Sequence, residues 1–214
     1  MSIQPQPVPK PAKNRLLQDG RDMFWSLAPL VVACIVLAGL VGMCSFQARG
    51  PQPGPVPSYD AAAALKSDAE TLGFPVRMPA VPQDWQPNSG ARSGLAAGRT
   101  DPATGQRVSA KVSTVGYLTA SGKYLSLTQS DADEDRLIAS IHDDVVPVGT
   151  EGVAGVRWIV YDGGERGEPV WTTRLAGGGA GTQIALTGAG SAEEFRTLAT
   201  ATQTAAPLSD QPRR

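Results

Sequence analysis

The longest apolar stretch covers residues 23–46, MFWSLAPLVVACIVLAGLVGMCSF, and contains no charged residue. At about 1.5 Å of rise per residue, a helix of this length can cross a hydrocarbon core of about 30 Å. The basic residues that precede it are Lys10, Lys13, Arg15 and Arg21, whereas only Arg49 follows closely. Cytoplasmic flanks carry an excess of Lys and Arg. The pattern therefore predicts a single-pass plasma-membrane protein, with a cytoplasmic N-terminus and an extracytoplasmic C-terminal domain.

This stretch has two other interpretations. A cleavable signal peptide has a shorter apolar region, of about 7–15 residues, and a small-residue exit. Val31-Val32-Ala33-Cys34 resembles a lipobox, and acylation of Cys34 would remove everything before it. The apolar residues IVLAGLVG that follow Cys34 favour a spanning helix. Because Cys34 and Cys44 both lie inside the stretch, the exported domain is predicted to contain no disulfide and no thiolate site.

The composition divides the chain into five segments. They are a cytoplasmic tail (1–22), the membrane helix (23–46), a Pro-rich linker (47–57), an extracytoplasmic domain (58–204) and a flexible tail (205–214). Alternating prolines in the linker favour polyproline II, a semi-rigid spacer. The formal net charge is -1, so no basic field is available to bind nucleic acid.

In the first part of the domain, the sequence predicts one helix and little β-structure. A helix over 59–72 would be capped by Ser58 and stopped by Gly73. Residues 74–79 are predicted to form a short extended segment at the edge of the sheet, because their prolines have no N–H group to donate to a neighbouring strand. A turn over 82–87 is expected to place Trp85 in the core.

In the rest of the domain, the sequence predicts a β-sheet and two helices. Apolar residues alternate over 108–117, but the alternation changes parity, which predicts a β-bulge near 113–114. The other predicted elements are a hairpin turn at 119–123, strands at 124–129, 156–161, 169–175 and 182–187, a glycine hairpin at 177–181, and helices at 133–141 and 191–202. Ser191 and Glu194 form a capping box for the last helix. The fold class is therefore α+β, a mainly antiparallel sheet flanked by about three helices.

Candidate catalytic residues are sparse. His142 is the one histidine, and it has no serine or carboxylate arrangement near it in the sequence. No nucleophile or zinc-protease motif is found in its expected context. We therefore expect no enzyme activity, no catalytic residue and no cofactor.

Two motifs resemble ligand-binding sites, but the residues in or beside each motif disfavour the ligand. Gly188-Ala-Gly-Ser191 follows a strand and opens a helix, as a phosphate cradle does, but Glu193 and Glu194 would repel a phosphate there. Asp131-Ala-Asp133-Glu-Asp135 has the alternating acids of a calcium loop. Its sixth and twelfth positions are Arg136 and His142, where that loop requires glycine and glutamate. No metal site is expected.

Several short motifs occur in an order that matches a known family. They are Arg21-Asp22 before the apolar stretch, the proline linker, Phe74-Pro-Val76, Pro82-Gln-Asp-Trp85, Val115-Gly-Tyr117, Gly122-Lys-Tyr124, Gln129-Ser-Asp131, Val153-Ala-Gly-Val-Arg-Trp158 and Thr187-Gly-Ala-Gly-Ser-Ala-Glu-Glu194. From about residue 20 to 203 the chain resembles the actinobacterial single-pass membrane proteins of the domain-of-unknown-function 4245 family. The resemblance implies no activity, cofactor or catalytic residue.

The expected function is a membrane-anchored, non-catalytic binding or envelope-scaffold module. Its expected partners are the lipid bilayer, through residues 23–46, and an envelope protein. Two alternatives remain open. An extracytoplasmic ligand sensor or carrier would contain an apolar cavity, and an unrecognised carboxylate-based hydrolase would show convergent carboxylates.

Overall fold

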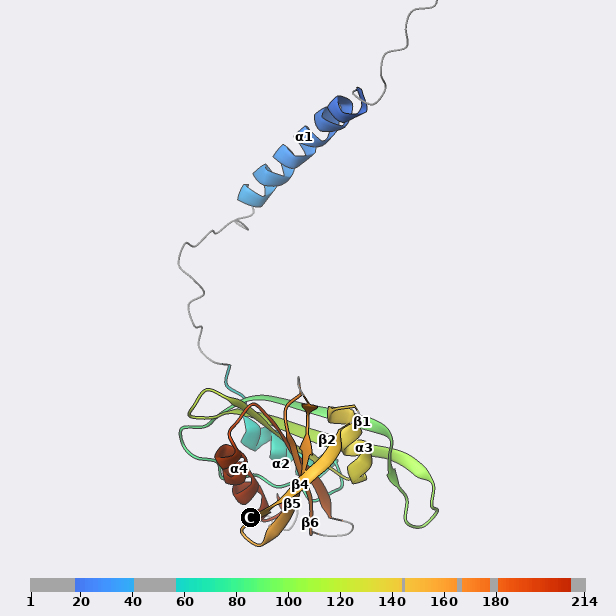
Figure 1. Cartoon of the computed structure of the whole chain (residues 1–214), viewed down its shortest axis with the longest axis vertical. Helices are drawn as coiled ribbons and strands as arrows, with labels where there is room; N and C mark the ends of the chain where they lie inside the picture. Colours follow the sequence, from blue (N-terminus) through green and yellow to red (C-terminus); the bar gives the residue numbers. More distant parts are fainter. Residues whose placement is uncertain (1–17, 41–56, 144, 165–166, 178–180, 209–214) are drawn as a thin grey trace, which may run out of the picture. The chain divides into compact units, whose positions relative to one another are not determined.

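The computed structural model describes residues 18–40, 57–143, 145–164, 167–177 and 181–208. The chain falls into two units, residues 1–54 and 55–214. The first unit contains helix α1, Gln18–Leu40 (Figure 1). Its exposed large apolar side chains are Phe24, Trp25, Leu27, Leu30, Val31, Val32, Ile35, Val36 and Leu37.

The predicted membrane helix is not supported by the described residues. Among them, no helix combines the length and the apolarity that crossing a membrane requires. Helix α1 starts before the apolar stretch, so its first residues include the charged Asp19, Arg21 and Asp22. Residues 41–46 of the predicted span, Cys44 among them, lie outside the described residues.

The second unit is built on one seven-stranded antiparallel sheet with the order β1-β2-β3-β7-β6-β5-β4. The strands are β1 Gln86–Thr100, β2 Arg107–Leu118, β3 Tyr124–Ser130, β4 Val146–Val153, β5 Val156–Asp162, β6 Val170–Leu175 and β7 Thr182–Gly188. Two meanders, β1–β3 and β4–β7, are joined where β3 pairs with β7. The end of the β1–β2 hairpin projects past the rest of the domain (Figure 1).

Helices cover both faces of the sheet. They are α2 Ala61–Thr71, α3 Glu134–Ile141 and α4 Ala192–Thr204. In β7, Ile184 and Leu186 pack with α2 and α4, whereas Ala185 between them packs with α3. Successive side chains of a strand point to opposite faces, so α2 and α4 lie on one face and α3 on the other (Figure 1). The predicted α+β class, with an antiparallel sheet and flanking helices, is confirmed.

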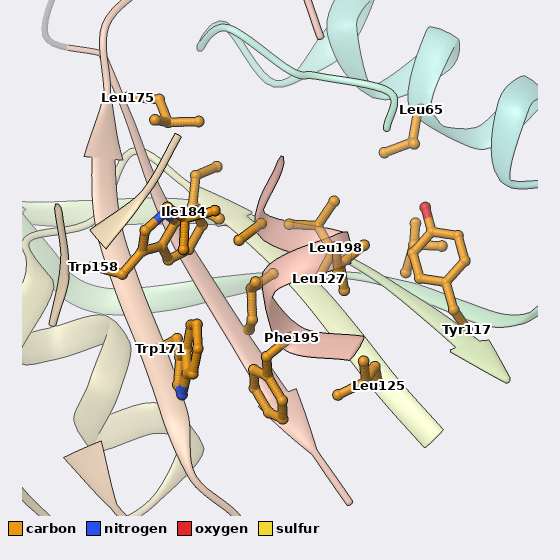
Figure 2. Close-up of a cluster of buried hydrophobic side chains, with 14 of the residues drawn as sticks. Leu65, Tyr117, Leu125, Leu127, Trp158, Trp171, Leu175, Ile184, Phe195 and Leu198 are labelled. Carbon is orange, nitrogen blue, oxygen red and sulfur yellow. The ribbon is translucent and has the colours of Figure 1, made fainter. Parts of the chain in front are cut away.

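The larger core lies under α4. Phe195 and Leu198 of α4 face the sheet side chains Leu127 and Ile184 (Figure 2). The Phe195 ring lies 5.2 Å from the Trp171 ring, centroid to centroid. The sequence placed this helix and its capping box correctly, because Ser191 and Glu194 mark its start.

The predicted bulge near residues 113–114 is wrong. Strand β2 pairs with β3 in unbroken register from Val112 to Leu118. Ala110 and Val112 pack in the cluster under α3, whereas Val115 and Tyr117 pack in the cluster under α4. The apolar residues change from even to odd positions because the first half of the strand is buried on the face under α3, whereas the second half is buried on the face under α4.

The sequence predictions missed β1 and β4, the two edge strands. Most β1 side chains are exposed or half-buried, and so are those of β4 before Val153. An edge strand with little burial has no strong apolar alternation to detect. Tyr59 fixes the start of the domain to β1, since its N–H donates to Pro87 O at 3.0 Å. A Cβ atom at Gly90 would collide with the Tyr59 ring.

Two local predictions in the first part of the domain are also corrected. Helix α2 is capped by Asp60 instead of Ser58, because the Asp60 carboxylate accepts from the N–H of Ala63 at 2.9 Å. The predicted extended segment 74–79 forms only an isolated bridge, from Arg77 to Pro207.

That segment is instead held by the side chain of Gln129, which is 1% exposed. Gln129 Oε1 accepts from Arg77 N–H at 2.8 Å, and Gln129 Nε2 donates to Arg77 O at 2.8 Å. The Arg77 guanidinium donates to the carbonyls of Ala176 and Ala205. Residues 205–208, assigned to the tail from the sequence, thus lie against the domain, where Leu208 N–H donates to Val76 O at 2.8 Å.

We expect Gln129→Leu to lower the free energy of unfolding by roughly 2–4 kcal/mol. The change removes two hydrogen bonds and leaves the N–H and C=O of Arg77 buried without these partners, at about 1–3 kcal/mol each. Urea unfolding measures the effect. Gln106→Leu, at an exposed position, is the matched control and should stay within about 0.5 kcal/mol of the unchanged protein. Equal stability of the two variants would contradict the assigned role of Gln129.

Candidate binding groove

A concave surface follows one flank of α4. Two clefts, with volumes of about 550 and 560 Å³, share the lining residues Pro82, Glu193 and Thr197. They therefore form one groove between α4 and residues 80–85, which we call the α4 groove. It opens to solvent.

The first wall is the turn that ends at Trp85. The Trp85 N–H donates to Pro82 O at 3.0 Å, and the Trp85 side chain is 7% exposed. The prediction that Trp85 anchors the core is confirmed. The same residue also borders the groove.

The β2–β3 turn and the β7–α4 junction close the N-terminal end of the groove. Thr119 N–H donates to Lys123 O at 2.8 Å, which forms the predicted hairpin turn and places Ser121 and Lys123 at the groove. At the junction, Ala189 N–H donates to Tyr124 O at 3.0 Å. Residues far apart in the sequence therefore meet beside the first turn of α4.

The carboxylate of Glu194 joins these walls. Its Oε2 accepts from Ser191 N–H at 2.7 Å, as the predicted capping box requires, and its Oε1 accepts from Ser121 Oγ at 2.8 Å. Hydrogen bonding from the Thr119 hydroxyl, followed by that from the Ser191 backbone, lowers the pKa of Glu194 from 4.5 to about 2. Glu194 is thus an ionised structural bridge.

The remaining charges of the groove are available to a ligand. The carboxylates of Asp84 and Glu193 and the ammonium of Lys123 have no ion-pair partner among the residues that the structure describes. Arg196 is engaged, because it contacts Glu151 at 3.1 Å and its guanidinium carbon lies 6.0 Å from the Trp171 ring centroid. The groove therefore offers more negative than positive charge.

The residues singled out by sequence lie elsewhere. His142 ends α3, where its N–H donates to Ile138 O at 3.0 Å. Asp133 contacts Arg107 at 2.9 Å, and Asp131 contacts Arg99 at 3.1 Å. No group of three or more His, Cys, Asp or Glu side chains suited to a metal ion occurs in the described part of the chain. Cys34 is exposed on α1.

Comparison with known proteins identifies a family. The family model described as "Protein of unknown function (DUF4245)" matches residues 15–202, which is most of the chain. No curated protein and no solved structure matches. The order of short motifs in the sequence had indicated the same family.

We expect Glu194→Gln to cost stability in a pH-dependent way. A carboxyl group whose folded pKa lies below its ordinary value stabilises the fold above that ordinary value, and the contribution is lost as pH falls through the folded pKa. The difference in unfolding free energy between the wild type and the variant should therefore be largest above about pH 4.5 and disappear near pH 2. Urea unfolding at several pH values measures this difference.

Glu70→Gln is the matched control. Glu70 is exposed on α2, and its replacement should change the unfolding free energy by less than about 0.5 kcal/mol. A Glu194→Gln effect that stays constant down to about pH 2 would contradict the role of its ionised carboxylate.

Proposed function

The chain belongs to the DUF4245 family of proteins of unknown function, and we propose that it is a non-catalytic binding module whose α4 groove holds a partner from the cell envelope. The α4 groove is the observation that supports this proposal. Beside the first turn of α4 it combines the apolar Pro82 and Trp85 with the unpaired charges of Asp84, Lys123 and Glu193. Protein interfaces typically combine apolar and polar contacts.

The walls of the groove are well fixed, which favours recognition. Phe195 and Leu198 hold α4 on the core, and Glu194 ties its first turn to Ser121. A surface that is already organised loses little conformational entropy on binding.

The chemistry of the groove favours binding over catalysis. A general acid that acts near neutral pH needs a raised pKa, whereas that of Glu194 is lowered and both its oxygens accept hydrogen bonds. The one histidine, His142, follows α3 on the opposite face of the sheet. The hydroxyl groups of the groove therefore have no imidazole beside them to act as a base.

A macromolecular partner fits the groove better than an enclosed small ligand. A carrier surrounds most of its ligand's surface, whereas the α4 groove opens to solvent along its length. We therefore favour the binding module over the sensor or carrier.

We further propose that residues 23–46 anchor the module in the plasma membrane, with the N-terminus cytoplasmic and the domain extracytoplasmic. The support is the absence of charge from these residues and the excess of basic residues before them. Residues 47–56 of the Pro-rich segment lie outside the described residues.

The topology is tested by reporter fusions after Thr204. Alkaline phosphatase, which needs an oxidising compartment, should be active there, and β-galactosidase at the same site should be inactive. Replacing Val32 and Val36 by Arg should release the fusion from the membrane fraction, because each charge costs about 2.5–3.5 kcal/mol at the centre of a span. Active β-galactosidase would overturn the proposed orientation.

Binding is tested by placing a photocrosslinking residue at Thr200, which is exposed in the α4 groove. The matched position is Ala139, exposed on α3 across the sheet. We expect one envelope protein, identified by mass spectrometry, to crosslink from Thr200 and not from Ala139. The purified partner should bind the full chain, and Thr200→Trp should weaken that binding whereas Ala139→Trp should not, because only the first change fills the groove.

Two results would contradict the binding function. One is the same crosslinked products from both positions. The other is reproducible turnover of an envelope substrate that stops when Asp84 or Glu193 is replaced by its amide.

A further inference from the structure

We propose that the α4 groove binds an extended, basic segment of polypeptide, an inference that rests on the proposed binding function and names its ligand. Three properties of the groove support it: its length, the acceptor groups along α4 and the unpaired charges that line it.

The length suits a short extended chain. Helix α4 contains 13 residues and at about 1.5 Å per residue is about 20 Å long. An extended segment of about six residues covers the same distance at about 3.3 Å per residue. The facing wall offers the short or compact side chains of Ala80, Val81 and Pro82, so the backbone of a ligand can lie close to α4.

A row of hydroxyl oxygens follows α4 along the groove. Thr197, Thr200 and Thr204 line it, and their spacing of three and four residues places them on one side of the helix. Thr197 Oγ1 donates to Glu193 O at 2.9 Å, and Thr204 Oγ1 donates to Thr200 O at 2.7 Å. Because these two hydroxyls already use their protons inside the helix, they present acceptor lone pairs outward. Such a row recognises donors, which the N–H groups of an extended backbone supply.

The charges specify a basic ligand. Asp84 and Glu193 are two carboxylates without ion-pair partners among the described residues, and Lys123 is the one unpaired cation at the same cleft. An anion is disfavoured at the start of α4, because the capping box occupies the N–H groups of Ser191 and Glu194 and because the carboxylates of Glu193 and Glu194 would repel it. Lys or Arg side chains of the ligand would pair with Asp84 and Glu193.

The test is a selection of random peptides of about six residues on the full-length chain in mild detergent. We expect the selected peptides to be enriched in Lys and Arg. The double variant Asp84→Asn, Glu193→Gln should bind them roughly tenfold more weakly, because each exposed ion pair contributes a factor of up to about five. The affinity should fall as the salt concentration rises.

The matched control is the double variant Asp143→Asn, Glu70→Gln, which removes the same charge from exposed positions outside the groove and should bind the peptides as the wild type does. A second variant, Asp84→Lys, should shift the selection away from Lys and Arg. Asp84 and Glu193 are exposed and have no ion-pair partner among the described residues, so their replacement should leave the fold intact.

The outcomes separate this inference from the proposed function. If Thr200 crosslinks an envelope protein but the selected peptides are neutral or acidic, or no peptide is enriched, the basic ligand is wrong and the binding function stands. If the same peptides bind both double variants equally, the assignment of Asp84 and Glu193 is wrong. If Thr200 crosslinks nothing and no peptide is enriched, both proposals fail.

Discussion

The pairing of β3 with β7 is the constraint on which the rest of the domain depends. It joins two meanders that are otherwise separate in the chain, with Leu127 opposite Leu186. The end of the ladder is tight, because Gly188 has a φ of +144° and a Cβ atom there would collide with Tyr124 O. A residue with a side chain would push the strands apart at this point. Since α4 follows Gly188 after a short junction, the same pairing brings the start of α4 to the β2–β3 turn, and the hydrogen bond between Ser121 and Glu194 becomes available.

The sequence could predict the structural features that depend on neighbouring residues within one segment. The capping box of α4, the anchoring of Trp85 and the turn at 119–123 follow from local residue types, and the structure confirms them. The two edge strands were missed because their side chains are largely exposed, so apolar and polar residues do not alternate along them. The bulge in β2 was inferred on the assumption that one face of the sheet is buried. Helices cover both faces, so a change of parity needs no irregularity in the backbone.

The groove could not be predicted, because its residues come from segments that only the fold brings together. Asp84, Lys123 and Glu193 belong to a turn, a hairpin and a helix, and no spacing along the chain relates them. Other polar interactions share this property. The buried carboxylate of Asp68 accepts from Ser113 Oγ at 2.5 Å and pairs with Arg92, three residues with no local motif. Long-range pairs of this kind depend on strand register and helix docking, which single-sequence periodicity does not determine.

Helix α4 has one side that packs in the core and another that lines the α4 groove. Its inner side buries Phe195, Leu198 and Thr202, where the Thr202 hydroxyl donates to Leu198 O at 2.7 Å. Its groove side carries Thr197, Thr200 and Thr204, which are only partly buried or exposed. The inner residues fix the position of the helix, so the outer hydroxyls keep their spacing without needing a ligand to order them. A groove arranged in this way can lose or exchange one of these threonine side chains while the core beneath stays packed, because α4 packs on the sheet through its inner residues.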